Sequence, residues 1–397
     1  MLEPERREFL IVGAGAAGLA AAEEAARAGV DTCLVYLQSR RVRAGGTDVR
    51  PNTSAWGIWG RTVATYSSGG RAERISADYV LLATGARPRP VIFPGWRTAG
   101  VTSCLDSVSG RVVMAGSGAQ LVHGAVELHR RGVDVRAVIE ATGAPWQVQA
   151  ATYLRQRGVR LRNRHLVVRA EGRERVERAI VARVDADWRV QPRTESAIDA
   201  DTIALDYGRV PCSELSRLSG CTHRRSTLDG LTPVYDEWMR TDAPGVLVAG
   251  GVCDARGLAM ARAQGRLAGL SVALALGKFT VAEAERRATR LRRLALEAEL
   301  AASPVGRGLF ELVQPDTLVC HCENVHAAEI QAAVIGGSPD AAAVRGETRA
   351  GMGVCQARDC GRQIEALVAR VAGVPMQEVP PLSVRPPVVP IPLGALA

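Results

Sequence analysis

The sequence has little lysine, few aromatic residues and no long apolar run. Lys278 is the only lysine among 50 basic residues, so the chain offers a single side-chain amine for Schiff-base chemistry. Aromatic residues make up 4% of the chain and do not alternate with the arginines, which is untypical of a nucleic-acid surface despite the net charge of +9. We therefore expect the arginines to lie on solvated faces and expect no nucleic acid as a partner.

The absence of a long apolar run also bears on location. No run reaches the ~20 residues of a membrane-spanning helix, and residues 1–8 lack the order of a signal peptide. We expect a cytoplasmic protein, with peripheral association to a membrane left open. A length of 397 residues indicates two or three domains.

The first strong pattern is a β-α-β unit. A strand-like run over residues 8–12 leads into Gly13-x-Gly15-x-x-Gly18, an alanine-rich helix and a second strand over residues 32–37. Glycines at this spacing let a pyrophosphate approach the backbone N–H groups at the helix N-terminus. The predicted nucleotide contacts are Gly13, Gly15, Ala16, Ala17 and Gly18.

Two later turns complete this pattern. Thr84-Gly85 follows the strand-like residues 79–83, and Gly250-Gly251 follows a strand that begins at Val246. Both turns are predicted to contact the nucleotide. A helix is expected from Gly257 to about Leu276.

Three features of a complete dinucleotide site are altered. The second strand ends in Tyr36-Leu37-Gln38 where an acidic residue would bind the ribose, and the stretch after it is short. The acid expected at the third turn is displaced to Asp254. We expect a nucleotide at the first site, with an empty turn as the alternative.

The β-α-β pattern then restarts. A strand over residues 111–115 precedes Gly116-x-Gly118, a helix over residues 119–131 and a strand that ends near Glu140. Glu140 stands where a ribose contact belongs, but Leu121 replaces the third glycine. We favour a structural domain here over an NAD(P) site.

Nine cysteines, an odd number, argue against a disulphide framework. Cys320 and Cys322 form one close pair, and Cys355 and Cys360 form another. Four converging thiolates suit a 2Fe–2S cluster or a structural zinc ion, and scattered packing cysteines remain the third interpretation. The residues between the pairs include a predicted helix over 325–334.

Residues 319–325 (Val-Cys-His-Cys-Glu-Asn-Val) and 348–361 closely resemble the 2Fe–2S domain related to bacterioferritin-associated ferredoxin. More narrowly, the chain resembles the α (large) subunits of hydrogen cyanide synthase, opine oxidase and the dye-linked proline and hydroxyproline dehydrogenases. The resemblance extends over stretches at Phe93-Pro94-Gly95-Trp96, 115–118, 218–221, 240–246 and 385–387. It implies that Cys320, Cys322, Cys355 and Cys360 bind a 2Fe–2S cluster, and that Cys221, Cys33, Cys104, Cys212 and Cys253 are packing residues. It also implies FAD at the first nucleotide site, with ATP or another adenine nucleotide as the alternative.

The resemblance implies an α/β fold with two Rossmann-like domains of the glutathione-reductase type, the second inserted in the first, and a small helical 2Fe–2S domain. The expected first domain comprises 1–104 and 226–279, and the second 105–225. A helical linker over 280–315, the 2Fe–2S domain over 316–378 and an extended proline-rich tail over 379–397 follow.

No substrate-oxidising constellation stands out, so the catalytic residues are unknown. There is no C-x2-C or C-x4-C in the first helix, and no histidine belongs to a nucleophile motif. The resemblance therefore implies an electron-transferring subunit of a heteromeric dehydrogenase for a small amino or imino acid such as glycine, proline, hydroxyproline or an opine. Its partners would be an electron acceptor, a further small subunit, and a flavin-containing β subunit. The alternatives are a stand-alone NAD(P)H-dependent flavin reductase and a non-catalytic scaffold.

Overall fold

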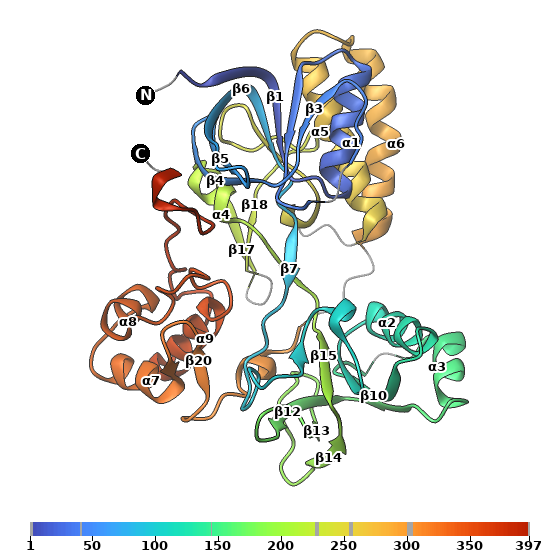
Figure 1. The fold of residues 1–397 in the computed structure, drawn as a ribbon, viewed down its shortest axis with the longest axis vertical. Helices are drawn as coiled ribbons and strands as arrows, with labels where there is room; N and C mark the ends of the chain where they lie inside the picture. Colours follow the sequence, from blue (N-terminus) through green and yellow to red (C-terminus); the bar gives the residue numbers. More distant parts are fainter. Residues whose placement is uncertain are drawn as a thin grey trace. The chain divides into compact units, whose positions relative to one another are not determined.

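The computed structural model describes residues 3–39, 42–143, 145–226, 230–253, 257–299 and 305–395 (Figure 1). The chain divides into two compact units. Unit 1 comprises Met1–Arg87, Val210–Ala302 and Ser383–Ala397, and unit 2 comprises Pro88–Arg209 and Ser303–Leu382. Asp254, the displaced acid of the third turn, lies outside the described residues.

Unit 1 is built on a 7-stranded sheet with the order β3-β2-β1-β6-β5-β4 and with β19 on β6. β1, β2, β3, β6 and β19 are parallel, whereas β5 pairs antiparallel to β6 and β4 pairs antiparallel to β5. The strands are β1 (Glu5–Val12), β2 (Thr32–Val35), β3 (Thr47–Arg50), β4 (Thr53–Trp59), β5 (Thr62–Ser67), β6 (Ala72–Leu82) and β19 (Val246–Val248).

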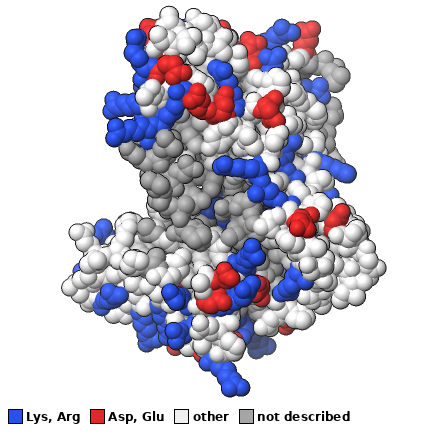
Figure 2. All heavy atoms as spheres, turned by 180° about the vertical axis from the view of Figure 1, so that it is seen from behind, with Lys and Arg blue, Asp and Glu red and all other residues white. Residues whose placement is uncertain are grey.

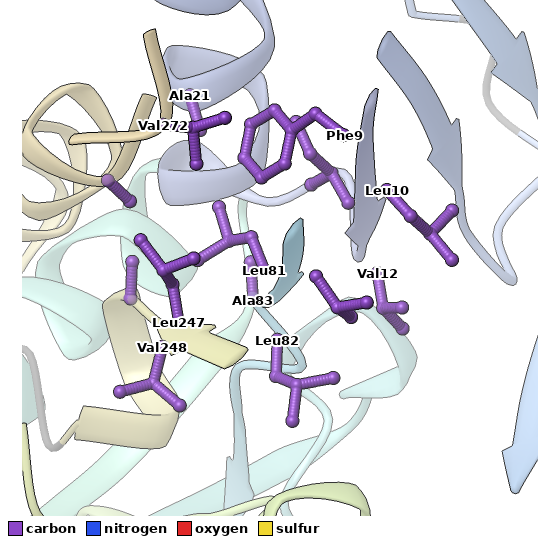
Figure 3. Close-up of a cluster of buried hydrophobic side chains, with 14 of the residues drawn as sticks. Phe9, Leu10, Val12, Ala21, Leu81, Leu82, Ala83, Leu247, Val248 and Val272 are labelled. Carbon is purple, nitrogen blue, oxygen red and sulfur yellow. The ribbon is translucent and has the colours of Figure 1, made fainter. Parts of the chain in front are cut away.

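Three helices pack beside this sheet: α1 (Ala16–Arg27), α5 (Leu258–Ala275) and α6 (Val281–Glu299). α5 contacts both α1 and α6 (Figure 1). Gly265 lets α5 approach α1 closely, because a Cβ atom there would overlap the carbonyl oxygen of Ala17. Phe9, Leu81 and Val272 meet in the buried core between sheet and helices (Figure 3). The helices predicted to begin near residues 257 and 280 are confirmed.

The connection between β2 and β3 is unusually short. β2 ends at Val35 and the parallel strand β3 begins at Thr47. Parallel neighbours usually need a crossover of a dozen or more residues that contains a helix. The described residues 36–39 and 42–46 contain no helix, in agreement with the shortening expected from the sequence.

Unit 2 contains the second Rossmann-like sheet, with the order β11-β10-β9-β15-β8, and a 3-stranded antiparallel sheet of β12, β13 and β14. The predicted helix over 119–131 is confirmed as α2 (Ala119–Arg130). The other elements are β8 (Val101–Thr102), η1 (Leu105–Ser107), β9 (Arg111–Gly116), β10 (Asp134–Glu140), α3 (Val148–Arg155), β11 (Arg160–Asn163), β12 (His165–Glu171), β13 (Arg178–Arg183), β14 (Ser196–Asp199) and β15 (Thr202–Asp206).

The cysteine-bearing part of unit 2 is a short antiparallel ladder followed by three helices. β20 (Leu318–Cys320) pairs with β21 (Val325–His326), and α7 (Ala327–Ile335) packs on α8 (Ala341–Thr348) and α9 (Gly361–Ala372). The helix predicted from residue 325 begins two residues later, because Val325 pairs with Cys320 in the ladder. The Asp340 carboxylate caps α8 by accepting from the N–H groups of Ala342 and Ala343.

The proline-rich tail returns to unit 1. The Val388 N–H donates to the Trp56 carbonyl oxygen at 2.8 Å, and the Val388 side chain is buried. Trp56 belongs to β4, the strand at the edge of the sheet. The tail therefore covers that edge, whose unpaired backbone groups would otherwise invite association.

The remaining elements are short. They are β7 (Ala86–Pro88), β16 (Arg209–Pro211), α4 (Glu214–Leu218), β17 (His223–Ser226), β18 (Gly230–Pro233), η2 (Gly250–Cys253), η3 (Arg307–Phe310) and η4 (Leu393–Ala395). None of the described helices combines the length and apolarity required to cross a bilayer. On the face drawn in Figure 2, basic and acidic side chains lie interspersed.

Candidate functional site

The structure brings the cysteines of the two predicted pairs together. Cys320 ends β20 and Cys322 follows in the turn to β21, whereas Cys355 and Cys360 lie in the loop that leads into α9. Cys322 and Cys355, Cys355 and Cys360, and Cys360 and Cys320 lie close enough for the members of each pair to shift each other's pKa. The four thiols therefore form a continuous chain of neighbours.

These contacts set the acidity of the thiols. Hydrogen bonding to Cys360 lowers the pKa of Cys320 to about 6 and that of Cys355 to about 5. The same contacts raise the pKa of Cys360. Because the thiolate is the form that binds metal, the lowered pKa values of Cys320 and Cys355 favour the ligand form of these two residues.

The thiols differ in burial. Cys320 and Cys360 are each 1% exposed, whereas Cys322 and Cys355 are half-buried. Within the described part of the chain, no three His, Cys, Asp or Glu side chains are placed to share one metal ion. A 2Fe–2S cluster does not need three ligands on one metal ion, because its four thiolates are divided between two irons.

The loop around the thiols has the backbone that a cluster requires. The Gly351 N–H donates to the Cys320 Sγ atom at 3.3 Å, and Gly353 packs directly against Cys322. Gln356 and Ala357 are consecutive left-handed residues, with φ of 50° and 63°. Left-handed turns of this kind direct backbone N–H groups toward anionic groups such as iron–sulphur clusters. The residues present therefore fit a 2Fe–2S cluster.

The first nucleotide turn has the tight packing predicted for its glycines. A Cβ atom on Gly18 would overlap the Gly13 carbonyl oxygen, and one on Gly13 would overlap the Ala83 carbonyl oxygen. Gly15 is the N-cap of α1 and has no side-chain cap, and a Cβ atom there would meet nothing within 4 Å. Gly13 and Gly18 thus hold the turn closed, while Gly15 leaves the helix N-terminus open to an anion.

The two later turns meet the first one, although some of their polar groups are already engaged. A Cβ atom on Gly250 would lie 2.8 Å from the Ala17 Cβ, and one on Gly251 would lie 2.8 Å from the Ala86 nitrogen. The Thr84 hydroxyl donates to the Cys212 carbonyl oxygen at 2.7 Å. Gly85 is left-handed at φ 77°.

One residue of this site carried no signal in the sequence. The Gly250 N–H donates to the Gln264 Oε1 atom at 2.8 Å, and Gln264 is a buried residue of α5. This backbone donor is therefore used by the protein. A glutamine inside an apolar helix does not by itself indicate such a role.

The ribose end of the first site is apolar. Tyr36 is buried, its hydroxyl accepts from the Val42 N–H at 3.3 Å, and the next residue, Leu37, is 63% exposed. The residues present fit the pyrophosphate of a dinucleotide, but no carboxylate stands at Tyr36, Leu37 or Gln38 to bind the ribose.

Glu140 lies at the corresponding place in unit 2. Its Oε1 atom accepts from the Thr142 hydroxyl at 2.8 Å and from the Gly118 N–H at 3.4 Å. Its Oε2 atom is buried without a hydrogen-bond partner. Burial raises the pKa of this carboxyl group.

A serine–histidine contact that the sequence did not indicate lies in unit 1. The Ser216 Oγ atom is 2.9 Å from His223 Nε2, and His223 Nδ1 is 2.7 Å from the Cys221 carbonyl oxygen. Ser216 is 1% exposed and its hydroxyl also donates to the Ser213 carbonyl oxygen. Burial lowers the pKa of the half-buried His223.

The packing role predicted for the other cysteines holds in part. Cys33, Cys221 and Cys253 are buried, and Cys212 is half-buried. Cys104 is exposed, so its predicted packing role is wrong. It follows the surface strand β8 and precedes a short 3-10 helix without entering a core.

Two family models cover most of the chain. A model described as pyridine nucleotide-disulphide oxidoreductase matches residues 39–277, and one described as BFD-like [2Fe-2S] binding domain matches residues 318–370. The fold and the two matches define an oxidoreductase of the flavoprotein class with a 2Fe–2S domain. FAD and a 2Fe–2S cluster are the cofactors of this class.

The chain is also similar to named proteins along its whole length. Hydrogen cyanide synthase subunit HcnB of Pseudomonas aeruginosa is 30% identical over 453 residues, which cover 97% of each chain. An opine oxidase subunit of Rhizobium meliloti is 27% identical over 461 residues, covering 98% of this chain and 88% of the relative. The chain therefore belongs to the family of HcnB, within the pyridine nucleotide-disulphide oxidoreductases.

Solved structures agree on the fold. The L-proline dehydrogenase from P. horikoshii has a TM-score of 0.74 at 21% identity and matches 100% of this chain and 81% of its own. The thioredoxin reductase from T. acidophilum has a TM-score of 0.57 at 19% identity, over 68% of this chain and 99% of its own. The HcnB alignment is longer than the 397 residues present here, so the relative carries stretches that this chain lacks.

Proposed function

We propose that this chain is the electron-transferring α-type subunit of a heteromeric dehydrogenase, with Cys320, Cys322, Cys355 and Cys360 as ligands of its cluster. The observation that carries the proposal is that β20, the turn after it and the loop leading into α9 bring the four cysteines of the two pairs together, with left-handed backbone at Gln356 and Ala357 between the last two. The cluster supplies one-electron transfer. The protein's own residues contribute the thiolates and the Gly351 N–H that contacts Cys320.

The substrate is proposed to be a small amino or imino acid, of the glycine, proline, hydroxyproline or opine type. The names of the relatives, hydrogen cyanide synthase and opine oxidase subunits, support this class. In the serine–histidine pair of unit 1, the serine is buried and its hydroxyl also donates to the Ser213 carbonyl oxygen, which does not suit a nucleophile. C–H oxidation is therefore assigned to a flavin-containing partner subunit, which takes the C–H hydrogen and two electrons as hydride while the N–H proton is released to solvent, before the electrons pass to an acceptor.

We propose that a dinucleotide binds at Gly13, Gly15, Ala16, Ala17 and Gly18, with Thr84, Gly85, Gly250 and Gly251 lining the same site. The open face of Gly15 supports the pyrophosphate contact. FAD is the first candidate, and ATP or another adenine nucleotide is the alternative because the ribose carboxylate is absent. Heat release and identification of the nucleotide separates the two.

The decisive experiment is anaerobic absorbance and EPR spectroscopy on the chain purified with its associated subunits. Visible sulphide-to-iron bands and a rhombic signal that develops on adding substrate are expected. A colourless chain containing zinc would overturn the proposal. A cluster that forms but is never reduced by any of these substrates would overturn the electron-transfer role and leave the scaffold interpretation.

A second candidate function is a stand-alone NAD(P)H-dependent flavin reductase. The observation that favours it is the buried Glu140 Oε2 atom without a partner, next to the N-terminus of α2. A ribose hydroxyl could donate to this oxygen. Bleaching of a bound flavin by NADH in the absence of partner subunits would support this candidate and displace the first.

A further inference from the structure

The turn at Phe93–Trp96, singled out by its sequence, is held rigidly inside unit 2. The backbone N–H of Trp96 donates to the Phe93 carbonyl oxygen at 3.0 Å, and the backbone N–H of Ala170 donates to the Pro94 carbonyl oxygen at 2.9 Å. Gly95 is left-handed at φ +81°, and a Cβ atom there would overlap the Ala170 carbonyl oxygen. The turn is therefore seated on β12.

The side chain of Trp96 leaves this turn toward the cysteine-bearing elements. Its Nε1–H donates to the Leu318 carbonyl oxygen at 2.7 Å, across 222 positions of sequence. Trp96 is 9% exposed, and the Arg97 guanidinium lies over its ring at 5.2 Å. An indole N–H is a donor only, so burying it without an acceptor would be unfavourable.

Leu318 begins β20, and Cys320 ends it. The pairing of β20 with β21 is irregular between these two residues, so the ladder alone holds the strand weakly there. The hydrogen bond from the Trp96 indole to the Leu318 carbonyl oxygen restrains this part of β20 from outside the ladder. Cys320 is in turn the thiol that accepts the Gly351 N–H.

We propose that Trp96 is a positioning residue of the cluster site, acting through Leu318 on the placement of Cys320. This inference rests on the proposed cluster ligands. Hydrogen bonds to cluster sulphurs set the reduction potential and the electronic signature. Losing the indole donor frees β20 to shift, which changes the geometry of the Gly351–Cys320 contact.

The test uses the purified, cluster-loaded complex carrying Trp96→Phe, Trp96→His or the matched control Trp146→Phe. Trp146 packs against the core of the second Rossmann-like sheet of unit 2, so it controls for loss of an indole. The readouts are the midpoint potential from an EPR-monitored titration, the g-values, and the rate of iron loss to a chelator. Melting temperature is recorded for each variant.

We expect Trp96→Phe to shift the potential and g-values and to lose iron several-fold faster. The ring of Trp96→His retains an N–H donor, so the potential, g-values and rate of iron loss of this variant should lie nearer the wild-type values. The control Trp146→Phe should give the wild-type values. Equal shifts in Trp96→Phe and Trp96→His would assign the effect to ring volume and overturn the inference, as would wild-type values in Trp96→Phe.

Failure of the proposed cluster ligands is distinguishable, because the wild-type complex would then give no 2Fe–2S signal at all, and failure of the proposed electron transfer would show as a wild-type cluster that substrate does not reduce. If neither Trp96 variant folds, Gly95→Ala provides a second measurement. It displaces the turn from Ala170 while leaving the indole intact, and it is expected to give the same direction of shift. An unchanged potential in Gly95→Ala would overturn the inference.

Discussion

Gly353 lies directly against Cys322, and the space that a Cβ atom would need at Gly353 is already filled by the Cβ and Sγ atoms of Cys322. Gly353→Ala is therefore expected to displace the Cys322 thiol and to reduce cluster content sharply, with an overpacking cost of about 1–3 kcal/mol. Iron and acid-labile sulphide per chain measure the loss. Gly346→Ala is the control, because a Cβ atom there meets nothing within 4 Å and α8 should gain about 0.5–1 kcal/mol. Equal cluster content in both variants would contradict the prediction.

The glycines of the first nucleotide turn separate folding from binding. Gly18→Ala would overlap the Gly13 carbonyl oxygen, so it should lower both the melting temperature and the nucleotide content. Gly15→Ala meets no protein atom within 4 Å and should leave the melting temperature of the nucleotide-free chain unchanged while lowering nucleotide content. Heat release followed by chromatography gives the content. Undiminished nucleotide in Gly15→Ala would place the pyrophosphate elsewhere.

Glu140 predicts a pH dependence of stability. Burial raises the pKa of its carboxyl group above the ordinary 4.5, so the folded chain binds this proton more tightly than the unfolded chain does. Its contribution to the free energy of unfolding is then present in full below about 4.5 and is lost as pH rises through the raised value. Glu140→Gln should abolish this fall. The free energy of unfolding of the variant, relative to that of the wild type at the same pH, should therefore be higher at pH 8 than at pH 5. Denaturant unfolding at both values checks it, and parallel pH profiles for the two chains would refute it.

The C-terminal tail is expected to protect an edge strand. Val388→Asp places a carboxylate in a site that is 3% exposed and removes an apolar contact worth about 1.5–3 kcal/mol. The tail should detach from β4, and the chain should associate at its uncovered edge. Size-exclusion chromatography measures this association. Leu393→Asp, at a residue 85% exposed, serves as the control and should remain unassociated; a Val388→Asp chain that elutes like it would argue against the role.

Sequence reasoning went furthest where a pattern determines local geometry. Gly13, Gly15 and Gly18 predicted a strand–turn–helix, and the turn is closed by the carbonyl contacts that only glycine permits. That pattern depends on residues that are close in sequence, so its consequences can be predicted without knowledge of the fold. The spacing of Cys320, Cys322, Cys355 and Cys360 left a cluster, a zinc ion and packing cysteines open, and the family resemblance was needed to favour a common cluster.

Contacts between residues that are far apart in the sequence could not be predicted from it. Nothing near Gln264 indicates that its amide oxygen would accept the Gly250 N–H, because α5 reaches that turn only through tertiary packing. The Trp96–Leu318 hydrogen bond joins residues 222 positions apart. The tail was expected to be extended, but its place along β4 depends on which strand ends the sheet.

The chain passes from unit 1 into unit 2 and back twice, which limits where the protein can be divided in a fusion or domain exchange. The 2Fe–2S segment lies in unit 2, yet the residues after Leu382 belong to unit 1 again. Topologically the iron–sulphur module is therefore an insertion with two joints, and it is not a terminal appendage. A graft that replaces everything beyond residue 302 would also remove the cover of β4, so exchange of this module between relatives requires that both joints be preserved.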